Sequence, residues 1–160
     1  MTIKNPYLKI VLQALAIAVF GFILLNLIFL FDALFQSLID LIIKPFTSVN
    51  VNMDMDWSWF PQVKHVLFVV VIGVVSWWVF RSKLNPLYKA IFMTVPTAVV
   101  LATVGITMYQ WPVVPYVVGG LLTLGTLYYF YKTKQPWFYY YSVILIALAL
   151  MIMGILGVDI

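Results

Sequence analysis

The chain has 160 residues and a mean hydropathy of +1.09; 65% of its residues are hydrophobic and 9% are charged. Soluble globular domains hold roughly 45–50% apolar and about 25% charged residues, so this composition excludes a soluble protein and predicts an integral membrane protein. In a membrane protein the positions of the charges set the topology, so the net charge of +4 does not indicate nucleic-acid binding. The absence of cysteine excludes disulfides and thiolate chemistry.

Five apolar segments are each long enough to cross about 30 Å of hydrocarbon as a helix. They are residues 10–31, 61–80, 87–109, 113–131 and 137–156. Asn5-Pro6 precedes the first segment and Asn85-Pro86 the third, and such pairs mark helix starts because asparagine caps the helix and proline fits its first turn. The sequence predicts an all-α fold, a polytopic bundle of five transmembrane helices in one membrane domain over residues 1–160.

Residues 32–60 join the first two spans and form the longest predicted connection. Its first part has helical periodicity, with Asp32, Gln36, Asp40 and Lys44 four residues apart. We expect an amphipathic helix that either continues the first span outward or bends into the interface, with an Asp40–Lys44 pair and an end at Pro45. Alternatively, this outer polar stripe lines a water-filled cavity, where carboxylates mark ion paths.

Residues 49–60 alternate apolar and polar side chains, which predicts an extended ribbon with one apolar face. The ribbon is expected to cover the outer ends of the helices, or to pair with a strand of a partner or of a second copy. Its Asp54 and Asp56, with His65, are candidate metal ligands of the right atom types, although their spacing matches no established site.

The positions of the charges predict one orientation of the chain. Lys4, Lys9, Arg81, Lys83, Lys89, Lys132 and Lys134 fall on one side of the predicted spans. Lys44, Lys64 and all five aspartates fall on the other side. This bias predicts a cytoplasmic N-terminus and an outer C-terminus. Arg81, Lys83, Lys89, Lys132 and Lys134 are also candidate contacts for anionic lipid headgroups, unless they serve topology alone.

Within the spans the sequence places hydroxyl groups and Asn26 but no ionisable residue at mid-depth, which argues against a proton relay. Small residues recur in the first span around Gly21, in the third up to Gly105, and in the last two as Gly119, Gly120, Gly125 and Gly154. We expect these residues to be contact points between helices. Pro96 is expected to kink the third helix.

No catalytic motif is present: the chain lacks cysteine and glutamate, has one histidine and has no phosphate-binding glycine loop. We therefore expect a non-enzymatic membrane companion, of the accessory, scaffold or immunity type, that acts through helix packing and its outer segment, without a cofactor. The alternative is an oligomeric conduit or binder for a small neutral or lipidic molecule, for which a polar path through Asn26, Thr97 and Thr103 would be the sign. Expected partners are the bilayer, anionic lipid on the inner face, and a second copy or another membrane protein.

Overall fold

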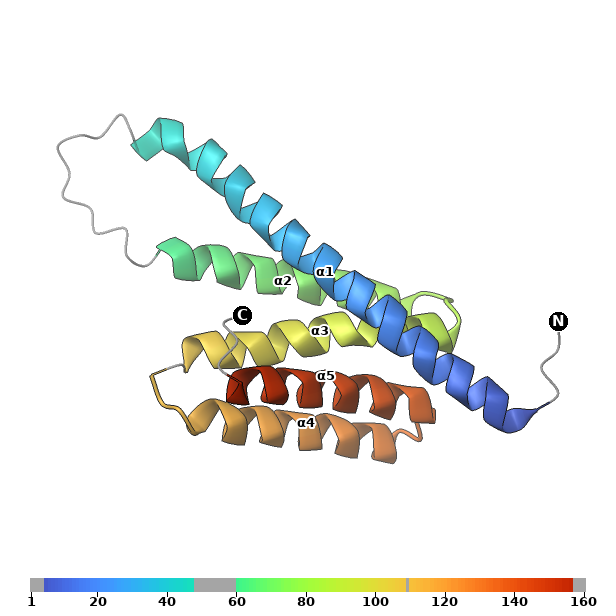
Figure 1. Ribbon diagram of the computed structural model, residues 1–160. Coiled ribbons are helices and arrows are strands. Elements are labelled where there is room, and N and C mark those ends of the chain that lie inside the picture. The colour runs from blue at the N-terminus through green and yellow to red at the C-terminus, as the bar shows by residue number, and fades with distance from the viewer. Residues whose placement is uncertain (1–4, 48–59, 109, 157–160) are drawn as a thin grey trace.

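The computed structural model describes residues 5–47, 60–108 and 110–156 and forms an all-α bundle of five helices (Figure 1). The helices are α1 (Pro6–Thr47), α2 (Phe60–Arg81), α3 (Pro86–Thr107), α4 (Val114–Lys132) and α5 (Trp137–Ile155). All of them except α4 contain a stretch long and apolar enough to cross a membrane. The protein is therefore an integral multi-pass membrane protein that contacts the lipid bilayer.

The two Asn-Pro pairs start helices as predicted. The Asn85 side-chain oxygen accepts a hydrogen bond from the Leu87 amide at 3.0 Å, and Asn5 does the same for Tyr7 at 3.0 Å. Proline follows each cap at the first helical position, where its missing N–H would have no partner in the helix. Local sequence chemistry thus fixes where α1 and α3 begin.

Helix α1 decides between the two predicted alternatives for residues 32–44 and corrects the predicted helix end. It is one continuous helix of 42 residues, so the predicted amphipathic helix at 32–44 is its direct continuation, and it ends at Thr47 rather than at Pro45. At 1.5 Å per residue it is about 63 Å long, roughly twice the hydrocarbon thickness. It crosses the other helices obliquely, and its N-terminal end projects past them (Figure 1). The predicted ribbon at 49–60 lies outside the described residues except for Phe60, which begins α2.

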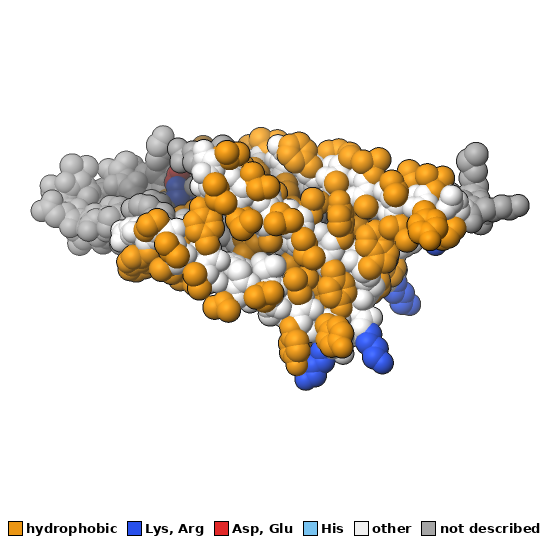
Figure 2. Space-filling view, turned by 60° about the horizontal axis from the view of Figure 1, so that its bottom comes forward, with side chains coloured by type: hydrophobic (Ala, Val, Ile, Leu, Met, Phe, Trp, Pro, Cys, Tyr) orange, Lys and Arg blue, Asp and Glu red, His pale blue; other side chains and the backbone are white. Residues whose placement is uncertain are grey.

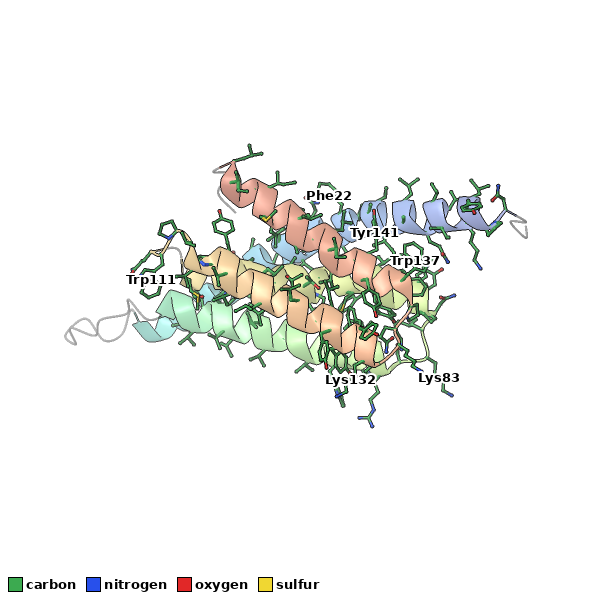
Figure 3. All side chains as sticks on the ribbon, turned by 90° about the horizontal axis from the view of Figure 1, so that it is seen from below. Phe22, Lys83, Trp111, Lys132, Trp137 and Tyr141 are labelled. Atoms are coloured by element: carbon green, nitrogen blue, oxygen red, sulfur yellow. The ribbon has the colours of Figure 1, made fainter. Side chains whose placement is uncertain are left out.

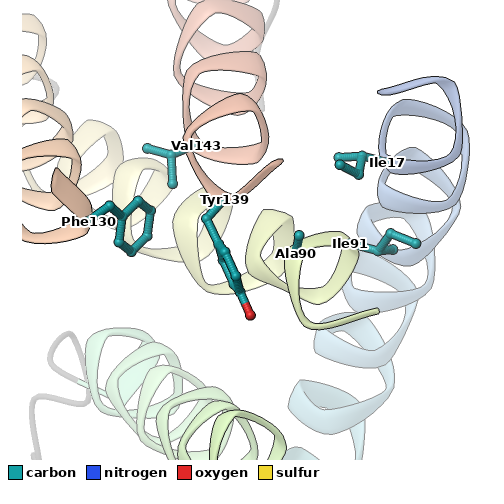
Figure 4. Close-up of a cluster of buried hydrophobic side chains, with 6 residues drawn as sticks. All are labelled: Ile17, Ala90, Ile91, Phe130, Tyr139 and Val143. Carbon is teal, nitrogen blue, oxygen red and sulfur yellow. The ribbon is translucent and has the colours of Figure 1, made fainter. Parts of the chain in front are cut away.

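Helix α3 is the centre of the bundle and packs against all four other helices. It stays helical through Pro96 and buries Thr94 and Val95 completely. One core cluster joins α1, α3, α4 and α5 (Figure 4) and consists of Ile17, Ala90, Ile91, Phe130, Tyr139 and Val143. A second core cluster joins α2 and α3 and consists of Phe68, Ile72, Val95 and Val99, and side chains of α1 pack against it.

Apolar side chains cover the face of the bundle seen in Figure 2, and large apolar side chains are exposed on all five helices. At most 28% of the most apolar window of any candidate span is buried. Lipid rather than water can solvate such a surface, so helix association here depends on close packing and on hydrogen bonds between helices. Ser142 on α5 makes one of these bonds, because its buried hydroxyl lies 2.7 Å from the Ala90 carbonyl oxygen on α3.

Candidate functional site

The predicted outer polar stripe does not form one uniformly exposed face. Asp32 and Gln36 are half-buried and bond to each other at 2.9 Å, whereas Asp40 is exposed. One oxygen of Asp32 is buried and has no hydrogen-bond partner in the structure. The neighbouring Phe31 and Phe35 pack against Phe68 of α2, so Asp32 lies alongside the α2 span rather than beyond it.

Asp40 forms an ion pair with the neighbouring helix α2. Its two carboxylate oxygens lie 2.9 and 3.1 Å from Nζ of Lys64 on α2, and the Lys64 side chain is only 11% exposed. The side chain of Lys44, the predicted partner, lies outside the described side chains. The ion pair joins α1 to the first turns of α2, on the side of the connecting segment.

His65 makes a second contact between helices, with its Nε2 atom 3.1 Å from the Thr103 hydroxyl on α3. Thr103 donates its single hydroxyl proton to the Val99 carbonyl at 2.6 Å, so the hydroxyl must accept from an Nε2–H of His65. The candidate metal partners Asp54 and Asp56 lie outside the described residues, and the described part of the chain contains no group of three metal-ligating side chains. Within that part, His65 serves as a hydrogen-bond donor between α2 and α3.

The five cations proposed to contact anionic lipid lie in or next to the α2–α3 and α4–α5 connections, and Lys83 and Lys132 lie at one end of the bundle (Figure 3). We call this the basic end, and the opposite one the Trp111 end. Arg81 stacks over the Trp77 ring at 5.1 Å, and Lys83, Lys132 and Lys134 are exposed. Lys89 differs, because its Nζ donates to the Phe80 carbonyl at 2.7 Å and caps the last turn of α2.

A large apolar cavity opens between α3, α4 and α5 toward the Trp111 end and measures about 730 Å³. It is lined by Leu101, Ala102, Gly105, Ile106, Pro112, Pro115, Tyr116, Gly119, Gly120, Thr123, Leu124, Ala147, Leu148, Leu150, Met151 and Gly154. A second cavity of about 170 Å³ shares Leu101 and Thr123 with it and reaches Pro96 and Met93 on α3. We call the two together the α3–α4–α5 groove.

Glycines keep this groove open. A Cβ atom added at Gly105 or Gly120 would meet no atom within 4 Å, and at Gly119 it would meet only Leu101, at 3.4 Å. Elsewhere glycine does allow close packing as predicted: a Cβ at Gly21 would lie 2.8 Å from the Thr94 methyl carbon. The expectation that glycines are helix contacts is therefore confirmed for Gly21 and wrong for Gly105 and Gly120, which line open space.

No protein-family model, curated protein or solved structure matches this chain.

The polar path considered for a conduit does not form among the described residues. Asn26 is exposed and donates to the Phe22 carbonyl of its own helix, and Thr97 bonds to Met93 in the same way. Thr97 lines the groove, whereas Thr103 faces His65 on α2. These groups lie in three different places and bond to different partners.

Proposed function

We propose that this protein is a non-enzymatic membrane protein that binds one chain of a membrane lipid in the α3–α4–α5 groove. The observation that carries the proposal is an apolar cavity of about 730 Å³ in whose wall Gly105 and Gly120 face open space. Ligand sites commonly measure about 300–1,000 Å³ and are mostly apolar. Tyr116 and Thr123 supply the only polar side chains of its lining, and none of the lining residues is charged.

The shape and position of the groove favour a lipid chain over a soluble ligand. Leu124, Leu148 and Met151 line it and are also exposed on the surface that faces lipid, so the groove is continuous with the bilayer. Along α3 it extends from Ile106 to Met93, which corresponds to about 20 Å at 1.5 Å per residue. That length exceeds the roughly 15 Å of hydrocarbon in one leaflet, so one acyl chain fits along it.

We further propose five crossings with a cytoplasmic N-terminus. Helices α3 and α5 both run from the basic end to the Trp111 end (Figure 1), so the chain must return between them, and α4 lies antiparallel beside α5. This path supports a membrane crossing for α4 although it is less apolar than the other helices. The cations gathered at the basic end support the cytoplasmic side for that end.

The basic end supports a separate contact with anionic headgroups. Arg81, Lys83, Lys132 and Lys134 are exposed there, and such cations attract anionic lipid by about 1 kcal/mol each near the membrane surface. Lys89 is left out of this set, because its ammonium group is already bonded to the Phe80 carbonyl.

A companion role through α1 is the second candidate. Helix α1 is about 63 Å long, and many of its large apolar side chains are exposed, including Phe22, Leu30 and Leu41. A helix of this length can reach a partner membrane protein or a second copy beyond the five-helix bundle.

The test of lipid binding compares two glycines of α4 that both face open space. Gly120→Leu fills the groove, whereas Gly125→Leu adds the same side chain outside the groove lining. Both changes favour helix formation by a little under 1 kcal/mol, so folding should survive in each. Crowding a site typically costs about 1–3 kcal/mol, so we expect Gly120→Leu to weaken lipid binding about fivefold or more, measured by native mass spectrometry with a phosphatidylcholine titrated into purified protein.

The Gly125→Leu protein should bind this lipid like the wild type. Equal binding by the Gly120→Leu and wild-type proteins would show that lipid does not occupy the groove.

A further inference from the structure

We infer that the groove, taken as the lipid site proposed above, selects an ester-linked lipid and that the Tyr116 hydroxyl recognises the ester carbonyl. Tyr116 lies in the first turn of α4, at the Trp111 end, and reaches across to the last turn of α5. A Cβ atom added at Gly154 would lie 2.7 Å from the Tyr116 hydroxyl oxygen. The glycine thus makes room for the phenol tip, which lies at the entrance of the groove.

The phenol is the one side-chain donor available to a ligand among the residues that line the groove. The other polar side chains of the lining are threonines, and each donates its hydroxyl to a carbonyl of its own helix: Thr97 and Thr123 at 2.8 Å and Thr126 at 2.9 Å. No residue in the described part of the chain forms a hydrogen bond with the Tyr116 hydroxyl, and this tyrosine is 44% exposed. Tyrosine commonly lies at the membrane interface, with its ring in hydrocarbon and its hydroxyl toward polar groups.

The position of Tyr116 in the groove indicates which part of a bound lipid its hydroxyl would contact. When a lipid chain fills the groove down toward Pro96, its first carbons lie beside Tyr116, because the groove runs from the entrance into the bundle. In ester lipids the chain begins at a carbonyl, which accepts a hydrogen bond, whereas an ether lipid with the same chains lacks that oxygen. Because no charged side chain lines the groove, the carbonyl rather than an ionic headgroup is the group recognised.

The test uses a phosphatidylcholine with ester-linked chains and its ether-linked analogue with the same chains, each titrated into the purified full-length protein and followed by native mass spectrometry. One neutral hydrogen bond corresponds to about a two- to tenfold preference, so we expect the wild-type protein to prefer the ester lipid by that factor. Tyr116→Phe should remove this preference and still bind both lipids.

Two further variants separate recognition from folding. Gly154→Ala should reduce the ester preference in the same direction, because the added methyl group displaces the phenol tip. Tyr128→Phe, on the exposed surface at the other end of α4, should leave the preference unchanged.

The possible results distinguish the inference from the proposed function. Equal binding of the two lipids by the wild-type protein, or a preference that survives in Tyr116→Phe, overturns the role of Tyr116 while groove binding stands. If the wild-type protein binds neither lipid, or Gly120→Leu binds both as well as the wild type, both proposals fall.

Discussion

Single side chains carry information that the sequence pattern does not show. Most hydroxyls of the spans, such as Thr97 and Thr126, bond to a carbonyl of their own helix, whereas Ser142 and Thr103 also bond between helices. Both groups are serine or threonine hydroxyls, and only the arrangement of the helices decides which of them bonds to a neighbouring helix. For this reason the sequence predicted the helix caps, which depend on adjacent residues, but not the His65–Thr103 contact.

Lys134 offers a test at this scale, because it is the one non-glycine residue with a positive φ, 51°, in the described part of the chain. It follows the end of α4, where the Gln135 amide donates to the Phe130 carbonyl at 2.9 Å and the Lys134 amide to Tyr131 at 3.2 Å. Glycine usually occupies this position, since a side chain there costs about 1–2 kcal/mol.

We expect Lys134→Gly to stabilise the protein by about 1 kcal/mol, measured by unfolding in mixed detergent micelles. Lys132→Gly is the control, because it places glycine within the last turn of α4 and should destabilise the protein by about 1 kcal/mol. Changes of the same sign in both variants would contradict the role assigned to the backbone conformation of Lys134.

At the scale of whole elements, the sequence predicted the helices better than their contacts. The bounds of α2 to α5 lie within two residues of the predicted spans, since apolar runs between charged or proline-containing turns define them. The continuation of α1 through residues 32–44 was one of two open alternatives. Which glycines pack and which line the groove could not be predicted, because that depends on the neighbouring helix: Gly21 faces Thr94, whereas Gly120 faces open space.

The contact between α1 and α3 at Gly21 can be measured directly. Gly21→Ala would place a methyl group 2.8 Å from the Thr94 methyl carbon, which is fully buried, so we expect a net loss of about 1–2 kcal/mol in the free energy of unfolding. Combining it with Thr94→Ser, which removes that methyl carbon, should recover much of the loss and give a coupling energy in a double-mutant cycle.

Gly73→Ala is the matched control for that experiment. A Cβ at this position meets no atom within 4 Å, and alanine favours helix over glycine by nearly 1 kcal/mol, so this variant should be slightly more stable. Equal losses at Gly21 and Gly73 would show that α1 does not pack closely on α3.

At the scale of the whole molecule, composition and charge placement predicted an all-α integral membrane protein, and the structure confirms this class. The hydrocarbon core excludes charge whatever the detailed packing, so composition alone identifies a membrane bundle. The groove was not predicted, because it arises where α3, α4 and α5 fail to fill the space between them.

The proposed topology predicts a labelling pattern that the natural absence of cysteine makes simple to read. We expect a single cysteine at Val113, which is 67% exposed at the Trp111 end, to react with a membrane-impermeant thiol reagent in whole cells. Cysteines at Lys83 and Lys134 should be protected until the membrane is permeabilised. Reaction at both Val113 and Lys134 from the same side would exclude a crossing by α4, and the reverse pattern would invert the orientation.

The short connection between α4 and α5, residues 133–136, bears on how the chain enters the membrane during synthesis. Tyrosines, glycines and threonines make α4 the helix least able to partition into lipid alone, whereas α5 is strongly apolar and lies against it. We expect the translocon to release the two as one hairpin, so in a chain cut after Lys134 a cysteine at Lys132 should react with the impermeant thiol reagent from the same side as one at Val113, and should be protected once α5 is added.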